Sequence, residues 1–138
     1  MKVYLAAPLF SDAEREFNRK LREEIENIGV SVFLPQEDSN DCGDSEEENE
    51  TIYHKNVAAI DASDAIVAVL DGSDVDSGTA WEVGYGYASG KPVYGIKTDF
   101  RSMGKEGPVN LMIFFSLRRL FMSVEELLEG AIIKNNLE

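Results

Sequence analysis

The residues best suited to chemistry lie in one segment, 71–86, with the sequence DGSDVDSGTAWEVGYG. It follows an apolar run, 64–70, that predicts a buried strand, and it enters a helix predicted over 79–89. In an open α/β sheet, ligands bind where strands end and helices begin. Glu82 lies inside this helix, flanked by Trp81 and by glycines that permit close approach. Such a carboxylate is either an ordinary solvated helix residue or a nucleophile, as in retaining glycosyl transfer.

Other kinds of site have weaker support. Residues 5–10, LAAPLF, stand where a dinucleotide-binding fold would carry its glycine-rich loop, and no Gly-Lys-Ser/Thr phosphate motif is present. His54 is the single histidine and Cys42 the single cysteine. A single cysteine excludes an internal disulfide and a cysteine-based zinc site. The carboxylates of Asp71, Asp74 and Asp76 could hold magnesium through oxygen ligands. Acidic loops between a strand and a helix are common without metal, however, and we predict no metal site.

The composition indicates one soluble domain, 1–138, with 43% hydrophobic and 28% charged residues. The net charge of −13 argues against nucleic-acid and anionic-membrane partners, because both require clustered Lys and Arg. No stretch approaches the roughly 20 apolar residues that span a bilayer. The first residues begin a strand pattern without the features of a signal peptide, so we expect a cytoplasmic protein.

Strands and helices alternate along the chain. Apolar runs predict strands over 2–8, 30–34, 64–70, 92–97 and 119–122. Capping boxes begin helices at Ser11 and Ser123, and further helices are predicted over 52–62, 79–89 and 110–115. Residues 36–50 are polar and acidic and predict a loop. This alternation predicts an α/β fold, a three-layer flavodoxin-like or Rossmann-like domain with a five-stranded parallel sheet.

Three motifs in this order resemble the nucleoside 2-deoxyribosyltransferase family, and the likeness covers nearly the whole chain. The first strand, 3–10, VYLAAPLF, is similar to the family's first-strand motif, which has a tyrosine near the catalytic glutamate. Residues 76–84, DSGTAWEVG, resemble the signature in which an aspartate precedes the nucleophilic glutamate by six residues. Residues 107–112, GPVNLM, resemble a loop that members insert into a neighbouring subunit's site.

The resemblance implies an enzyme that transfers 2-deoxyribose between nucleobases by retaining double displacement, without a metal or organic cofactor. Glu82 would be the nucleophile and Tyr4 the catalytic residue that orients it. Asp76 and Asn110 would bind the 5′-hydroxyl, with Met112 against the sugar or base. The implied partners are a 2′-deoxynucleoside and a free nucleobase in nucleotide salvage. A homo-oligomer is also implied, in which Asn110 and Met112 complete a neighbouring site.

Three further residues are candidates for substrate binding. Gly78 belongs to the glutamate signature, and Asn56 stands where some members carry an aspartate near the base. Asparagine can hydrogen-bond a base but cannot protonate it, so the proton of the leaving base is left to water or another carboxylate. Phe10 follows the first strand and is assigned either to the site or to the core. Base preference stays open.

Two alternative functions remain from the sequence. A related branch of the family hydrolyses the N-glycosidic bond of nucleoside 5′-monophosphates. The first alternative is therefore an N-glycosidase that hydrolyses (deoxy)nucleoside 5′-monophosphates or nucleosides. Asp76 argues against a nucleotide substrate, because a desolvated carboxylate facing a phosphate is repelled by several kcal/mol. A non-catalytic nucleoside- or nucleotide-binding module would not require Tyr4, Asp76, Glu82 and Asn110 together.

Overall fold

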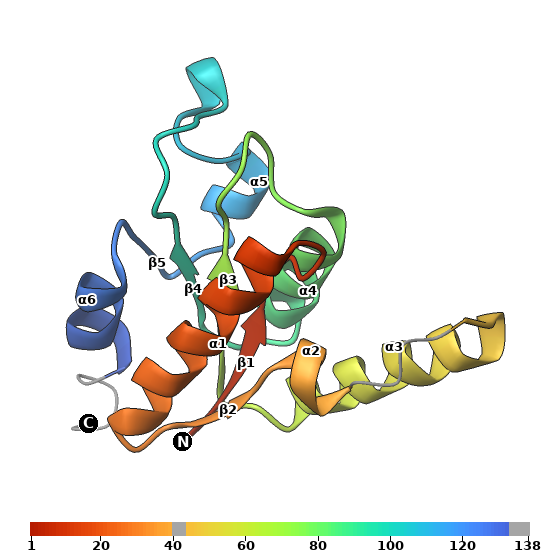
Figure 1. The fold of residues 1–138 in the computed structure, drawn as a ribbon. Coiled ribbons are helices and arrows are strands. Elements are labelled where there is room, and N and C mark those ends of the chain that lie inside the picture. Colours follow the sequence, from red (N-terminus) through yellow and green to blue (C-terminus); the bar gives the residue numbers. More distant parts are fainter. Residues whose placement is uncertain (40–43, 133–138) are drawn as a thin grey trace.

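The computed structural model describes residues 1–39 and 44–132, which form one five-stranded parallel sheet (Figure 1). The strand order is β2-β1-β3-β4-β5, so the predicted flavodoxin-like α/β architecture is confirmed. Each strand pairs in parallel with its neighbours, for example Tyr4 of β1 with Phe33 of β2 and with Ile66 of β3. The strands are β1 Lys2–Ala6, β2 Ser31–Phe33, β3 Ala65–Val69, β4 Val93–Ile96 and β5 Arg119–Phe121.

Helices cover both faces of the sheet and give it three layers. On one face, Val3 and Leu5 of β1 pack in a core with Leu21 and Ile25 of α1 and with Leu127 of α6. On the other face, the alternate strand residues pack against α3, α4 and α5. The helices are α1 Asp12–Asn27, α2 Pro35–Asp38, α3 Glu46–Asp61, α4 Ser77–Ala88, α5 Leu111–Phe114 and α6 Val124–Leu127. A 3₁₀ turn, η1 Gly104–Glu106, and a π-helical turn, η2 Leu128–Ile132, complete the described elements.

The direction of winding reverses between β1 and β3. From β1 the chain passes through α1 to β2 at one edge, whereas from β3 it passes through α4 to β4 on the other side. In sheets of this order, the strands on either side of the reversal leave a crevice beyond their carboxyl ends. The segments that leave β1 and β3 therefore border the expected ligand site.

The predicted loop over 36–50 is wrong in part, because two helices occupy much of it. Pro35 opens α2, and α3 begins at Glu46, well before the predicted start at residue 52. The Ser45 hydroxyl caps α3 by accepting the backbone N–H of Glu48, and acidic residues in the first turn are favourable at the positive end of the helix dipole. Cys42 lies outside the described residues.

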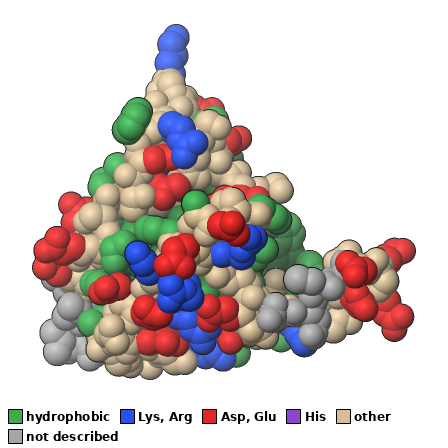
Figure 2. Space-filling view, viewed as in Figure 1, with side chains coloured by type: hydrophobic (Ala, Val, Ile, Leu, Met, Phe, Trp, Pro, Cys, Tyr) green, Lys and Arg blue, Asp and Glu red, His purple; other side chains and the backbone are tan. Residues whose placement is uncertain are grey.

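Charged residues are dense on helices α1 and α3. Figure 2 shows acidic and basic side chains crowded together over α1 at the front, and acidic side chains at the far end of the projecting helix α3. Within the described residues, no helix is both long enough and apolar enough to cross a membrane.

Candidate functional site

A cavity of about 500 Å³ lies at the carboxyl ends of β1 and β3, where the winding reverses. Segments from four parts of the chain line it: the residues after β1, the start of α2, the middle of α3 and the first turns of α4. The lining residues are Ala7, Leu9, Phe10, Pro35, Tyr53, Asn56, Val57, Ile60, Asp76, Ser77, Gly78, Trp81 and Glu82. The cavity thus brings together five predicted site residues, Phe10, Asn56, Asp76, Gly78 and Glu82.

Glu82 is the most perturbed carboxylate in the cavity. It lies on α4, and one of its oxygens accepts a hydrogen bond from the Tyr4 hydroxyl. Burial raises the pKa of Glu82 to about 7; the Tyr4 hydrogen bond opposes this shift and the nearby negative charge of Asp76 adds to it. A carboxyl group with a pKa near neutrality, set in a cavity, is typical of a functional site.

Tyr4, the donor of this hydrogen bond, lies on strand β1. Its side chain is fully buried in β1 and stacks on Phe33 with ring centroids 5.6 Å apart. Burial, followed by the negative charge of Glu82 and the hydrogen bond to it, raises the pKa of the Tyr4 phenol well above its usual value. Tyr4 therefore stays protonated at neutral pH and can act as a fixed hydrogen-bond donor to Glu82.

Asp76 has two tasks in the structure. It is the N-cap of α4, where Oδ2 accepts the backbone N–H of Thr79 at 3.0 Å and the Thr79 hydroxyl at 3.1 Å. The same side chain also lines the cavity. A Cβ atom at Gly78 would lie 3.3 Å from Asp76 Oδ2, so glycine leaves the capping carboxylate room. Gly78 also lines the cavity, and its predicted role in substrate binding stays a prediction.

Aromatic rings form one wall of the cavity. Phe10 is 71% exposed and lines the cavity, so its assignment to the core is wrong and its assignment to the site fits. Tyr53 and Trp81 contact each other edge to face at 5.6 Å, and Trp81 stacks on Tyr85 at 5.2 Å. Sequence reasoning assigned neither Tyr53 nor Trp81 to the site. Flat, half-exposed rings of this kind suit the face of a planar ligand.

Asn56 lies on the α3 side of the cavity. Its side-chain oxygen accepts a hydrogen bond from the buried Ser39 hydroxyl at 2.5 Å. Tyr53, Asn56, Val57 and Ile60 follow the i, i+3, i+4, i+7 spacing of one helix face, and all four line the cavity. That spacing was the available signal for Tyr53.

Asn110 and Met112 lie away from the cavity of their own chain. Asn110 is the N-cap of the short helix α5 and accepts the backbone N–H of Met112 at 2.8 Å. Met112 is 71% exposed. Neither residue lines the cavity. Their predicted role in a neighbouring site stays a prediction.

The acidic loop after β3 has a structural use. Asp71 accepts hydrogen bonds from the backbone and hydroxyl of Thr98, and Asp74 accepts the backbone N–H of Val75. Across residues 1–39 and 44–132, no three His, Cys, Asp or Glu residues gather in a way that could hold a metal ion. The carboxylates of this loop are thus engaged by the protein itself.

Comparison with known proteins identifies the family of the chain. A family model described as nucleoside 2-deoxyribosyltransferase matches residues 3–119. The chain belongs to this family. An uncharacterized protein of Ureaplasma parvum is 30% identical over 116 residues, which are 73% of this chain and 72% of that protein.

Several solved structures share the fold of this chain. A 2-deoxyribosyltransferase from Bacillus psychrosaccharolyticus has a TM-score of 0.83 and 27% identity, covering 97% of this chain and 95% of its own. A protein from Enterococcus faecalis has a TM-score of 0.79 and 29% identity, covering 98% of each chain. A CMP N-glycosidase from Clostridium botulinum has a TM-score of 0.54 and 19% identity, covering 94% and 96%, and shares the fold alone. Membership indicates an enzyme of the deoxyribosyltransferase type.

Proposed function

We propose that this protein transfers 2-deoxyribose between nucleobases through a covalent intermediate on Glu82. The observation that carries the proposal is the half-buried Glu82 carboxylate, which accepts a hydrogen bond from the buried Tyr4 phenol in a cavity lined by aromatic rings. A solvated helix glutamate would have neither the raised pKa nor the buried phenol donor. Family membership supports the same type of reaction.

In the first step, an oxygen of Glu82 attacks C1′ of a 2′-deoxynucleoside while the bond from C1′ to the base breaks. The base leaves with the bonding electrons and takes a proton from solvent, since Asn56 cannot supply one. An ester between Glu82 and C1′ results. The Tyr4 hydroxyl keeps the attacking carboxylate oriented and carries part of its charge.

In the second step, a nitrogen of another base attacks C1′, loses its proton to solvent, and releases the Glu82 carboxylate. Two inversions at C1′ give net retention. Phe10, Tyr53 and Trp81 would stack on the base and exclude water, so that transfer outruns hydrolysis.

The cavity favours a free nucleoside over a nucleotide. None of the described residues that line it is a lysine, arginine or histidine, and two of them, Asp76 and Glu82, are acidic. Asp76 uses Oδ2 for the helix cap, which leaves its other oxygen as an acceptor for the 5′-hydroxyl. A 5′-phosphate would meet negative charge there without a compensating cation.

The test is incubation with 2′-deoxyinosine and excess adenine, with product analysis by liquid chromatography; deoxynucleoside 5′-monophosphates are assayed in parallel. Formation of 2′-deoxyadenosine, and trapping of the sugar on Glu82 by mass spectrometry, is the expected result. Hypoxanthine without a new nucleoside would identify an N-glycosidase. Preference for a monophosphate would contradict the role given to Asp76, and no turnover of any substrate would favour a binding module.

We also propose that active sites are shared between subunits of a homo-oligomer, with Asn110 and Met112 completing a neighbour's cavity. Glu82→Ala supplies Asn110 but lacks the nucleophile, whereas Asn110→Ser retains Glu82 and keeps a good N-cap for α5. Each variant alone should be inactive or weak, and mixing them with subunit exchange should restore transfer. Mixtures no more active than the sum of the separate variants would contradict shared sites.

A further inference from the structure

Two loops that follow the neighbouring strands β3 and β4 exchange hydrogen bonds through a pair of aspartates. After β3, the Asp71 carboxylate accepts the backbone N–H of Thr98 at 2.6 Å and of Asp99 at 3.1 Å, and the Thr98 hydroxyl at 2.7 Å. After β4, the Asp99 carboxylate accepts the backbone N–H of Gly72 at 2.8 Å. Each loop thus supplies an acceptor for the backbone of the other.

A buried lysine braces this exchange. The Lys97 side chain is 1% exposed, and its ammonium donates to Asp99 Oδ1 at 2.6 Å and to the Gly72 carbonyl at 3.2 Å. Arg101 donates to the other Asp99 oxygen at 2.7 Å. Burial alone would raise the pKa of Asp99, but these hydrogen bonds outweigh it and lower that pKa to about 2. The loop clamp, as we call it, consists of Asp71, Gly72, Lys97, Thr98 and Asp99.

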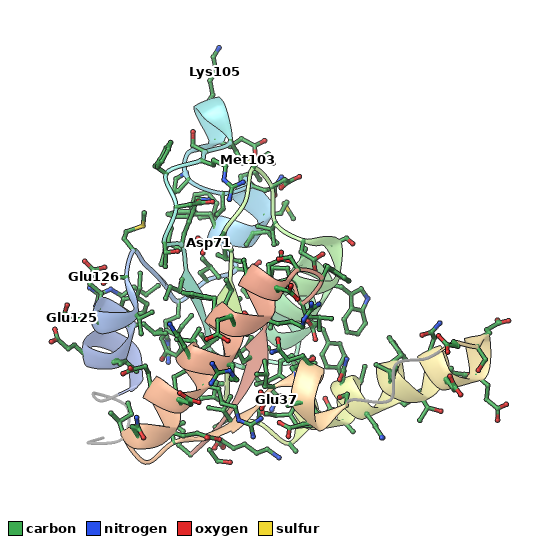
Figure 3. The ribbon with its side chains drawn as sticks, viewed as in Figure 1. Glu37, Asp71, Met103, Lys105, Glu125 and Glu126 are labelled. Atoms are coloured by element: carbon green, nitrogen blue, oxygen red, sulfur yellow. The ribbon has the colours of Figure 1, made fainter. Side chains whose placement is uncertain are left out.

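Two residues of the loop clamp, Asp71 and Gly72, precede Asp76, the residue proposed to bind the sugar, by only a few positions. Figure 3 shows Asp71 beneath the loop that carries Met103, at the upper end of the sheet. Gly72 has φ of +119°, so the chain turns there in a conformation that favours glycine. The same short segment then delivers Asp76 to the cavity.

Buried ion pairs are a poor source of stability. Apolar side chains of similar size often stabilise a fold as well or better, because charges lose their hydration on burial. The charged side chains of Lys97 and Asp99 instead fix the position of the loop, because each forms a hydrogen bond with one backbone group of Gly72 and so holds it relative to β4. Such a device suits a loop whose position matters for binding.

We propose that Asp99 is a positioning residue, which acts through the loop clamp to hold Asp76 where the 5′-hydroxyl of the substrate binds. The inference rests on the proposed function of Asp76. Asp99 does not line the cavity, so its influence reaches the substrate through the backbone of 72–76. A small displacement of this segment weakens the hydrogen bond from the 5′-hydroxyl and leaves Glu82 in place, because Tyr4 holds Glu82 independently.

The experiment compares 2′-deoxyinosine with 2′,5′-dideoxyinosine, which lacks the 5′-hydroxyl. KM and kcat are measured for wild type, for Asp99→Ala and for the matched control Asp64→Ala. Asp64 likewise accepts a backbone N–H, from Lys2 at 2.7 Å, but next to the amino ends of β1 and β3. Asp99→Ala should raise KM for 2′-deoxyinosine about tenfold and that for the dideoxy analogue less than about twofold. Asp64→Ala should change neither.

Two more variants separate positioning from loss of fold. Asp99→Asn keeps an acceptor for Gly72 and should recover part of the affinity. Lys97→Met with Asp99→Leu removes both charges, leaves no unpaired buried ammonium, and should unfold near the wild-type temperature while showing the same selective rise in KM.

The outcomes distinguish the inference from the function beneath it. Suppose that wild type prefers 2′-deoxyinosine but that the Asp99 variants raise KM equally for both substrates, or for neither. This result would overturn the positioning role alone. Wild type that treats both substrates alike would overturn the role of Asp76. Wild type that turns over neither would overturn the proposed function, and the inference with it.

Discussion

The helices α1 and α4 follow neighbouring strands and lie on opposite faces of the sheet, and they use their carboxylates in opposite ways. On α1, exposed glutamates pair with arginines, as in the Arg19 contacts with Glu16 at 2.6 Å and Glu23 at 2.9 Å. On α4, Glu82 is half-buried and receives a phenol hydrogen bond, and none of the described residues that line its cavity is a lysine, arginine or histidine. The carboxylates of α1 thus stay in contact with water, whereas that of Glu82 on α4 is partly removed from it.

The comparison indicates which helix is built for folding and which for chemistry. A charged group kept in water costs little and contributes little. A carboxylate forced toward neutrality by burial is destabilising when ionised, and it persists where the charge has a use. The same difference appears at the two N-caps, since Ser11 only caps α1 whereas Asp76 caps α4 and also lines the cavity.

The largest expected effect is the loss of the α4 carboxylate. Glu82→Ala should lower kcat for base exchange by about 10³-fold or more, equivalent to about 4 kcal/mol of transition-state stabilisation. Glu23→Ala on α1 is the control and should leave kcat unchanged. Steady-state assays with 2′-deoxyinosine and adenine measure both. Transfer retained by Glu82→Ala would remove Glu82 from the mechanism.

The next effect concerns stability and pH. Because the pKa of Glu82 rises to about 7 in the folded state, ionisation destabilises the fold progressively between pH 4.5 and 7 and by a constant amount above. Glu82→Gln should therefore be more stable than wild type by up to about 3 kcal/mol at pH 8, with little difference at pH 4.5. Chemical denaturation at the two pH values measures this. Equal stabilities of wild type and Glu82→Gln at pH 8 would contradict the raised pKa of Glu82.

The same ionisation should appear in the kinetics. In the proposed mechanism only the charged carboxylate attacks C1′, so kcat/KM should rise with pH to a plateau, with a midpoint near 7 set by Glu82. Tyr4→Phe removes the hydrogen bond that favours ionisation and should move the midpoint upward. A midpoint near 4.5 in the wild type would place the nucleophile in water.

A smaller effect is expected at Asp76. Asp76→Asn keeps a good N-cap and replaces a charged acceptor by a neutral one. It should lower kcat/KM for 2′-deoxyinosine about fivefold, since hydrogen bonds to charged groups exceed neutral ones by about 1 kcal/mol. Turnover of 2′-deoxyinosine 5′-monophosphate should improve at the same time. Competition between the two substrates measures the ratio, and an unchanged ratio would contradict electrostatic selection.

The smallest effect is on α1. Ser11 accepts the backbone N–H of Glu14 at 3.1 Å, and Ser11→Ala should reduce the free energy of unfolding by about 1 kcal/mol. Base exchange by the folded protein should be unchanged. Urea unfolding with parallel assays checks both. A fall in kcat would show that α1 also serves the site.

Local spacing made much of the molecule predictable. Alternating strands and helices gave the parallel sheet, and Asp76, Gly78 and Glu82 could be grouped because they lie on one helix turn or next to it. Tyr4 was assigned through the resemblance to the family, whose first-strand motif has a tyrosine near the catalytic glutamate. Asn56 and Phe10, from other segments, were placed through the resemblance to the family.

What escaped prediction depended on contacts between distant segments. Tyr53 comes from α3 and meets Trp81 of α4 across the cavity, a contact that neither helix pattern encodes. The start of α3 was missed because its acidic first turn suggested a solvated loop, although Ser45 and Glu48 have capping spacing. The hydrogen bonds of the loop clamp join aspartates 28 positions apart, and sequence alone suggested only a possible metal loop.

The double use of Asp76 has a consequence for how this enzyme can diverge. Aspartate, asparagine, serine and threonine are all good N-caps, so exchange among them leaves α4 capped. The same exchange changes the charge that a substrate meets in the cavity. A single substitution at residue 76 could therefore change the substrate preference of a descendant with little loss of stability. Under the proposed function, a substitution of Glu82 or Tyr4 would instead change the reaction.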